Sequence, residues 1–152
     1  MGFLLKCIKI KLFIFAVLEK TLVKTPKKIA FGFSLSSLPL LERLQASKHV
    51  DQIFISHGSN LYLEQKIEGL VQSLPIDFLK NHWQKNNQLI FVGAIGAVVR
   101  LVSPFVRSKE NDPAVIVVDS RANNVITLLG GHKQGGEAFG NELAAALEAE
   151  LI

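Results

Sequence analysis

The feature that most restricts the fold is a run of five apolar residues, Ala114–Val118 (AVIVV), which no polar side chain interrupts. A strand with one face in water alternates apolar and polar residues, so an unbroken apolar run predicts a strand that is covered on both faces. Helices are the elements that cover a parallel sheet in this way. The run therefore predicts a sheet between two layers of helices.

Other short apolar runs alternate with longer amphipathic segments from Lys28 onward, which is typical of an α/β domain. Strands are predicted at 29–33, 52–56, 89–92, 114–118 and 125–129. The turn-forming segment 119–124 (DSRANN) joins the last two strands, which predicts either a hairpin or a crossover pair. We expect a three-layer α/β/α sandwich over residues 28–152, with a mainly parallel sheet of about five strands and an antiparallel hairpin as an option.

The helical spacing of apolar residues predicts the covering helices. One begins near Ser36 or Ser37, with Pro39 in its first turn. Others are predicted over 61–74, 76–84 and 97–102, and a last helix runs from residue 137 or 140 to the end of the chain. The aromatic side chains of Phe78 and Trp83 are expected in the core, not on a base-stacking surface.

Residues 1–27 are expected to form an extension outside this domain. Leu12–Leu18 (LFIFAVL) is apolar and follows several lysines, but the run is too short to cross a bilayer and no small-residue cleavage site follows it. We expect an added strand or a loosely ordered extension, with no stable membrane insertion. A segment that lies on a membrane surface is the alternative.

Composition narrows the partners and the compartment. The formal net charge is +4, but the basic residues are scattered or gathered near the N-terminus and do not alternate with aromatic residues. This pattern disfavours nucleic acid and remains compatible with a small polyanion. The single cysteine, Cys7, excludes an internal disulfide and a cysteine-only metal site, so the reducing cytoplasm is the expected location.

The segment Gly93–Arg100 (GAIGAVVR) places two glycines between a predicted strand and a predicted helix. Glycine permits close approach of the backbone to a ligand, and the first amides of a helix attract anions. Gly93, Gly96 and Arg100 are therefore candidates for binding a carboxylate or phosphate, and a tight structural turn is the alternative. An ion pair of Arg100 with Asp112 or Glu110 is an alternative of equal weight.

The loop Gly130–Gly136 (GGHKQGG) has paired glycines on both sides of His132 and Lys133. It is not a nucleotide P-loop, because no lysine and hydroxyl residue follow its last glycines. A neutral imidazole can take or give a proton near pH 7, so His132 is the candidate catalytic residue. The histidines show no metal-ligand spacing, and His57 at a predicted strand end is a minor candidate.

Three stretches together resemble one known family: Gly96–Pro104 (GAVVRLVSP), Lys109 with Asp112–Asp119 (DPAVIVVD), and Leu128–His132 (LLGGH). They look like the hallmark run of the cobalamin synthesis G N-terminal family. The resemblance is close over residues 89–136 and does not cover residues 1–27. It departs from the family in two respects: the segment Lys133–Gly140 is longer than in relatives, and family hydrolases continue into a central segment and a C-terminal domain.

The resemblance implies cobalt-precorrin 5A hydrolase activity, in which a lactone of a carboxylate-fringed corrin precursor is opened and a two-carbon fragment leaves as acetaldehyde. It implies a cobalt-precorrin substrate that carries its own cobalt, and no cofactor bound by the protein. It also implies a separate chain that supplies the C-terminal domain or a precorrin methyltransferase.

The same resemblance suggests roles for the candidate residues. His132 would act on a water or on the lactone, and the carboxylates would be seated by a common set of binding residues: Gly93, Gly96, Arg100, Asp112, Gly130, Gly131 and Lys133. One alternative is a non-catalytic module that binds a tetrapyrrole intermediate or partners a precorrin methyltransferase. The other is a generic nucleotide-binding α/β domain, which the missing G-x-G-x-x-G fingerprint disfavours.

Overall fold

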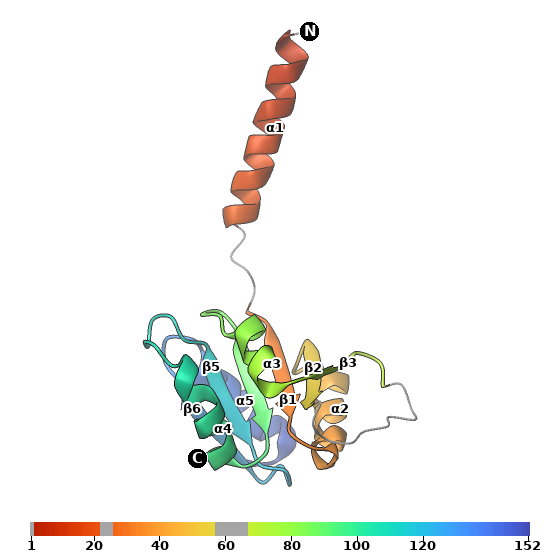
Figure 1. Ribbon diagram of the computed structural model, residues 1–152, viewed down its shortest axis with the longest axis vertical. Coiled ribbons are helices and arrows are strands. Elements are labelled where there is room, and N and C mark those ends of the chain that lie inside the picture. Colours follow the sequence, from red (N-terminus) through yellow and green to blue (C-terminus); the bar gives the residue numbers. More distant parts are fainter. Residues whose placement is uncertain (1, 22–25, 57–66) are drawn as a thin grey trace.

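The computed structural model describes residues 2–21, 26–56 and 67–152, and within them one sheet has the strand order β3-β2-β1-β4-β5-β6-β7 (Figure 1). The strands are β1 (Lys28–Gly32), β2 (Gln52–Ser56), β3 (Leu70–Ser73), β4 (Gln88–Val92), β5 (Ala114–Val118), β6 (Asn124–Leu129) and β7 (Glu150–Leu151). The helices are α1 (Gly2–Thr21), α2 (Leu38–Ala46), α3 (Pro75–His82), α4 (Ile95–Val102) and α5 (Gly136–Leu147), with short 3-10 turns η1 (Leu35–Ser37) and η2 (Ser103–Phe105).

Every neighbouring pair of strands is parallel except β5 and β6, which are antiparallel. The predicted mainly parallel sheet is therefore confirmed, and the choice left open for residues 119–124 is decided in favour of the hairpin. The sheet has seven strands instead of about five because the short strands β3 and β7 extend its two edges.

Helices cover both faces of the sheet, as the apolar run in β5 predicts. In Figure 1, α3 and α4 lie in front of the sheet and α2 and α5 lie behind it. Successive residues of β4 alternate between two buried clusters: Leu89 and Phe91 pack with α3 and α4, and Ile90 and Val92 pack with α2 and α5. All five residues of β5 are buried. The α/β/α sandwich is confirmed.

The prediction of a helix over 61–74 is wrong in its described part. Residues 57–66, which include His57, lie outside the described residues, and Leu70–Ser73 form β3 beside β2. The reason lies at Gly69, whose φ of 75° interrupts any helix before the strand begins. The helix predicted over 76–84 is confirmed as α3.

The last helix ends earlier than predicted. Glu148 takes a left-handed conformation with a φ of 55°, and Ala149 donates its N–H back to the carbonyl of Ala144. This is a common way for a helix to stop, and it releases Glu150 and Leu151 to pair with β6. At the start of α2, Ser37 stands at the N-cap with Pro39 in the first turn, as predicted, but its side chain makes no capping hydrogen bond.

The N-terminal segment is helical, so the prediction of an added strand or a loose extension is wrong for residues 2–21. A helix satisfies its backbone hydrogen bonds internally, whereas a strand needs a neighbour, and both edges of the sheet already carry β3 and β7. Within the described residues, no helix combines the length and the apolar content that crossing a bilayer requires.

Candidate functional site

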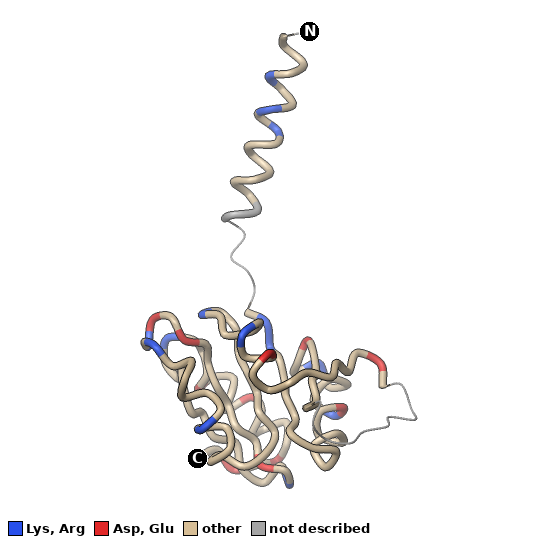
Figure 2. The backbone as a smooth tube through the Cα atoms, viewed as in Figure 1, with Lys and Arg blue, Asp and Glu red and all other residues tan. Residues whose placement is uncertain are grey.

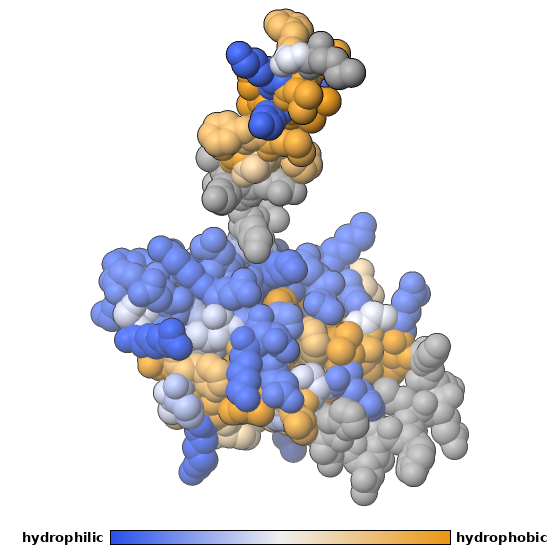
Figure 3. Space-filling view, turned by 45° about the horizontal axis from the view of Figure 1, so that its top comes forward, coloured by the Kyte–Doolittle hydropathy of each residue, from blue (hydrophilic) through white to orange (hydrophobic). Residues whose placement is uncertain are grey.

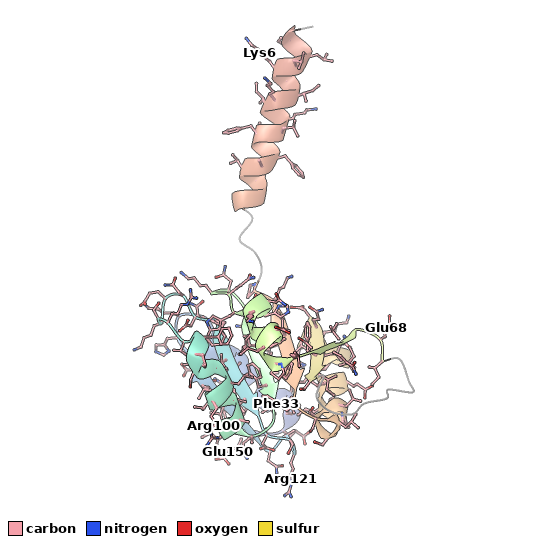
Figure 4. The ribbon with its side chains drawn as sticks, in the orientation of Figure 1. Lys6, Phe33, Glu68, Arg100, Arg121 and Glu150 are labelled. Carbon is pink, nitrogen blue, oxygen red and sulfur yellow. The ribbon has the colours of Figure 1, made fainter. Side chains whose placement is uncertain are left out.

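The two glycine-rich loops lie at opposite ends of the strands. Gly93 follows the end of β4, where the parallel strands terminate, and Figure 4 shows Arg100 at this lower end of the sheet. Because β6 runs antiparallel to β5, its last residue, Leu129, pairs with Val115 at the start of β5. The five residues of β5 separate the two ends of this strand by roughly 15 Å. The structure therefore keeps the two loops and Arg100 apart, and their joint binding of one ligand stays a prediction.

A pocket of about 730 Å³ lies at the N-terminal end of β5. It brings together five of the residues selected from the sequence: Asp112, Gly130, Gly131, His132 and Lys133. Its other lining residues are Val106, Arg107, Ser108, Lys109, Leu128 and Leu129. Pockets of this size hold ligands the size of a typical cofactor or drug.

The pocket combines an apolar wall with cations. Val106, Leu128 and Leu129 supply the apolar surface, while Arg107 and Lys109 are exposed on the loop before β5. Lys133 adds a third cation, from the histidine loop. Such a surface suits a flat apolar ring that carries carboxylates at its margin, since the ring needs apolar cover and the carboxylates need cations. Neither Val106 nor Arg107 was predicted as a site residue, although basic residues between a predicted helix and a buried strand were a visible signal.

The glycines give the histidine loop its shape. Gly130 has a φ of 69°, and a Cβ added there would lie 2.7 Å from the backbone Cα of Ala114. Its carbonyl accepts hydrogen bonds from the N–H groups of Gln134 and Gly136, and the carbonyl of Gly131 accepts one from Glu137. The first amides of α5 are thus satisfied within the loop, so the loop is unlike the amide cradles that bind phosphate.

His132 is held by one polar contact. Its Nδ1 lies 2.9 Å from Oε2 of Glu137, and its side chain is 93% exposed. A carboxylate at Nδ1 favours the tautomer that carries the proton there, which leaves the Nε2 lone pair free to accept a proton. Glu137 lies in the segment Lys133–Gly140, which is expected to be longer than in the family, and it supplies the group that orients the candidate base.

An ion pair joins the two loops that border the pocket. Nζ of Lys133 lies 2.9 Å from Oε1 of Glu110, and Nε2 of Gln134 donates to the backbone carbonyl of Glu110 over 3.5 Å. The hydrogen bond from Lys133 is the main reason why the pKa of Glu110 lies below its ordinary value, and a hydrogen bond from its own backbone N–H contributes as well. Lys133 is therefore partly neutralised, which leaves Arg107 and Lys109 as the stronger attraction for an anion.

Asp112 supports the pocket wall from inside. The residue is 6% exposed, and its carboxylate accepts hydrogen bonds from the N–H of Arg107 at 2.8 Å and from the indole Nε1 of Trp83 at 3.2 Å. These bonds explain why an acid is tolerated there, and they fix the loop that carries Arg107. Arg100 has no share in them: its Nη1 donates to the carbonyl of Gly96, so the predicted ion pair with Asp112 or Glu110 is wrong.

At the carboxyl ends of the parallel strands lies the point where the chain crosses from one half of the sheet to the other. β1 and β4 are adjacent there, and the carboxyl ends of such strands commonly form ligand sites in α/β folds. Gly93 has a φ of 154°, and a Cβ added to it would meet the ring of Phe33 at 2.8 Å. Phe33 was not among the predicted site residues, although it is the last residue of a predicted strand (Figure 4). Its ring covers the turn that the sequence offered as an anion site.

The charged and apolar groups of the pocket contain no metal centre. Among the residues that the structure describes, no three His, Cys, Asp or Glu side chains gather closely enough to hold a metal ion. The arrangement is that of an organic-anion site: an apolar wall, cations on one side and a single oriented imidazole on the other.

Comparison with known proteins places these residues in a family. The family model "Cobalamin synthesis G N-terminal" matches residues 77–152, which include the whole pocket lining. The chain is 39% identical over 88 residues to the cobalt-precorrin-5A hydrolase of Priestia megaterium, covering 58% of this chain and 22% of that protein. It is 48% identical over 64 residues to the enzyme of the same name from Salmonella typhimurium, covering 42% of this chain and 18% of that protein.

A solved structure shares the fold. The crystal structure of a cobalamin biosynthesis protein G homologue from Sulfolobus solfataricus aligns with a TM-score of 0.57 and 23% sequence identity, over 83% of this chain and 36% of that one. The chain thus spans about a fifth of the length of the two enzymes that it matches.

Proposed function

The chain belongs to the cobalamin synthesis G N-terminal family, and on that premise we propose that it is the macrocycle-binding part of a cobalt-precorrin 5A hydrolase. The chain spans about a fifth of the length of the relatives of that name, and a separate polypeptide that supplies the remaining parts of the enzyme is part of the proposal. Assembly in the cytoplasm is part of the proposal.

The observation that carries the proposal is the pairing of an apolar wall with cations in one pocket of about 730 Å³. A corrin precursor is a flat ring fringed with carboxylates. Leu128, Leu129 and Val106 would contact the ring, and Arg107 and Lys109 would pair with carboxylates at its margin. The cobalt enters as part of the substrate, so the protein needs no metal ligands of its own.

His132 is the proposed base for the lactone-opening step. With Nδ1 turned toward Glu137, Nε2 would take a proton from a water as the water oxygen attacks the lactone carbonyl. The ester C–O bond then breaks, the ring oxygen leaves as a hydroxyl after receiving that proton, and a carboxylate remains. Acetaldehyde would then leave from the opened product: the new hydroxyl loses its proton, the C–C bond to the ring breaks, and the ring takes the electron pair of that bond together with a proton. Glu137 acts as a positioning residue in this scheme.

One observation favours a second candidate, a non-catalytic module that holds a tetrapyrrole intermediate for a partner such as a precorrin methyltransferase. The side chain of His132 is 93% exposed, whereas a general base usually works where water is excluded. A module of this kind would need the apolar wall and the cations but would not need the imidazole.

Binding and turnover separate these candidates. Titration with a cobalt corrinoid, followed by its visible absorption, should show binding that weakens roughly three- to tenfold when Arg107 and Lys109 are both replaced by glutamine, the effect of losing two exposed charge pairs. Arg121→Gln is the control, because Arg121 is exposed at the end of the sheet opposite to the pocket (Figure 4). Equal weakening by the control would remove the pocket assignment.

Acetaldehyde release is then measured with cobalt-precorrin 5A, in the presence of the chain that carries the remaining domains. His132→Ala should reduce the rate by about 10²- to 10⁴-fold with little change in corrinoid binding. A His132→Ala protein with full activity would exclude His132 as the base. Activity that never requires this chain, together with intact corrinoid binding, would favour the non-catalytic module.

A further inference from the structure

Helix α1 exposes apolar side chains along its whole described length. Every residue from 2 to 18 is exposed, including large side chains such as Phe3 at 81%, Leu4 at 71% and Phe13 at 71%. Figure 1 shows the helix standing clear of the sheet, whose two faces are already covered by α2, α3, α4 and α5. An apolar helix of this kind needs a contact surface outside the domain, because most of the stability of a helix comes from burial of its apolar side chains.

The charge over residues 2–18 of α1 has one sign. Lys6, Lys9 and Lys11 lie within this stretch, which contains no aspartate or glutamate. Figure 2 shows blue and no red over the coloured part of this helix, and Figure 3 shows blue among orange, hydrophobic side chains there. Lys27 and Lys28 continue the positive charge where the domain begins. The covering surface should therefore be both apolar and negatively charged.

The positions of the side chains indicate how the helix would lie. Leu4, Ile8, Leu12 and Phe15 recur at intervals of four, four and three residues, which places them on one side of the helix. Lys6 and Lys9 lie on the other side, which also carries Ile10, Phe13 and Val17, so apolar side chains surround the helix. The long lysine stems can carry the ammonium groups from such an apolar surface to the headgroups of a lipid bilayer, which suits a helix that binds at the lipid interface.

We propose that α1 binds to the surface of an anionic lipid bilayer and holds the attached domain beside it. The headgroups would pair with Lys6, Lys9 and Lys11, and the apolar side chains of the helix would enter the boundary of the acyl chains. This function is separate from the pocket and does not rest on the proposed hydrolase. A second copy of α1 could also cover apolar residues, but four lysines and the single acid Glu19 give each copy a net charge of +3, so two copies would repel each other.

Vesicle sedimentation with the full chain tests the proposal. Binding should be roughly a hundredfold tighter to phosphatidylglycerol vesicles than to phosphatidylcholine vesicles at low salt, since each lysine at an anionic surface contributes about a fivefold factor. Replacing Lys6, Lys9 and Lys11 by glutamine should abolish that preference. A matched triple change on the domain, at Lys48, Lys80 and Lys85, should preserve it.

Replacing Leu12 and Phe15 by serine should weaken binding to the anionic vesicles, while circular dichroism checks that the helix persists. Three results would each overturn the proposal: no binding to anionic vesicles, equal binding to both lipids, or full binding by the lysine variant. Concentration-dependent self-association in sedimentation velocity that persists with vesicles present would assign the helix to a second copy instead. A failure of corrinoid binding would leave this test unaffected.

Discussion

Replacing Gly130 by alanine tests how far the pocket depends on the geometry of its loop. The new Cβ would lie 2.7 Å from the Cα of Ala114 and 3.0 Å from the carbonyl oxygen of Pro113, and neither backbone atom can rotate away. The φ of 69° adds a conformational penalty of about 1–2 kcal/mol for a residue with a Cβ. Forcing the strand and loop apart adds about 1–3 kcal/mol. Reduced freedom of the unfolded chain returns about 0.4–1 kcal/mol.

The net loss should be about 1–4.5 kcal/mol in the free energy of unfolding. Urea denaturation followed by circular dichroism should therefore show a midpoint lower by roughly 0.5–2 M, for a slope of about 2 kcal/mol per M. Gly131→Ala is the matched control: its added Cβ would meet nothing closer than 3.8 Å, so its stability should change by less than about 0.5 kcal/mol. Equal stability of the two variants would refute the close approach of the loop to β5.

Three further outcomes are expected. Asp112→Ala should lower stability by about 2–3 kcal/mol, because it leaves the indole of Trp83 and the N–H of Arg107 without their acceptor, and should shift the emission of the single tryptophan, whereas Asp112→Asn should retain much of both. The pKa of Asp119 lies below its ordinary value: burial raises it, but hydrogen bonds from the Asn124 side chain and from backbone amides outweigh that effect. Its stabilisation should be present above about pH 4 and be lost as the pH falls through the lowered pKa, so Asp119→Ala should show a smaller loss between pH 7 and pH 3 in urea titrations. Burial and the charge of Lys27 lower the pKa of His82, so the folded protein should lose stability as the pH falls below about 6.5, and His82→Leu should reduce the difference between pH 7 and pH 5.

The strands were predictable wherever apolar residues are both consecutive and buried on two sides. Ala114–Val118 is the clearest case, because an apolar run of this length has no other stable position in a sheet covered by helices. The hairpin after it could not be decided from turn residues alone. It depends on the carboxylate of Asp119, which accepts hydrogen bonds from the N–H groups of Arg121 and Asn124 and so closes the turn.

The edge strands and the ends of helices were harder to predict because their residues are less buried. In β3 the two central residues are exposed, so the run Leu70–Ser73 carries no alternating signal that separates it from a helix. The two-residue strand β7 is too short to produce any pattern, and it depends on contacts with β6 far away in the sequence. The helical state of residues 2–21 was missed because an apolar run of that length is compatible with either element.

The location of the site depends on the direction of one strand. A crossover at 119–124 would have made β6 parallel, and the loop after Leu129 would then have lain beside Gly93 at the carboxyl ends of the strands. The hairpin reverses β6 and brings His132 to the amino ends of the parallel strands, next to the loop that carries Arg107. Residue types indicate which chemistry each loop could support, but no local pattern contains the direction of a strand. The candidate residues were therefore found individually, and their grouping required the structure.

The same reversal explains why the candidate base needs a further surface. The loop that carries His132 follows β6, a strand near the edge of the sheet, so no helix of the described domain covers the imidazole and its side chain is 93% exposed. A base in open water competes with the solvent for the proton that it removes, and a closed site removes that competition. If the macrocycle itself supplies the cover, the NMR signals of the His132 ring should change on corrinoid binding in this chain alone. If the partner chain supplies it, the change should appear only in the complex, and NMR titration of the His132 ring with and without the partner distinguishes the two.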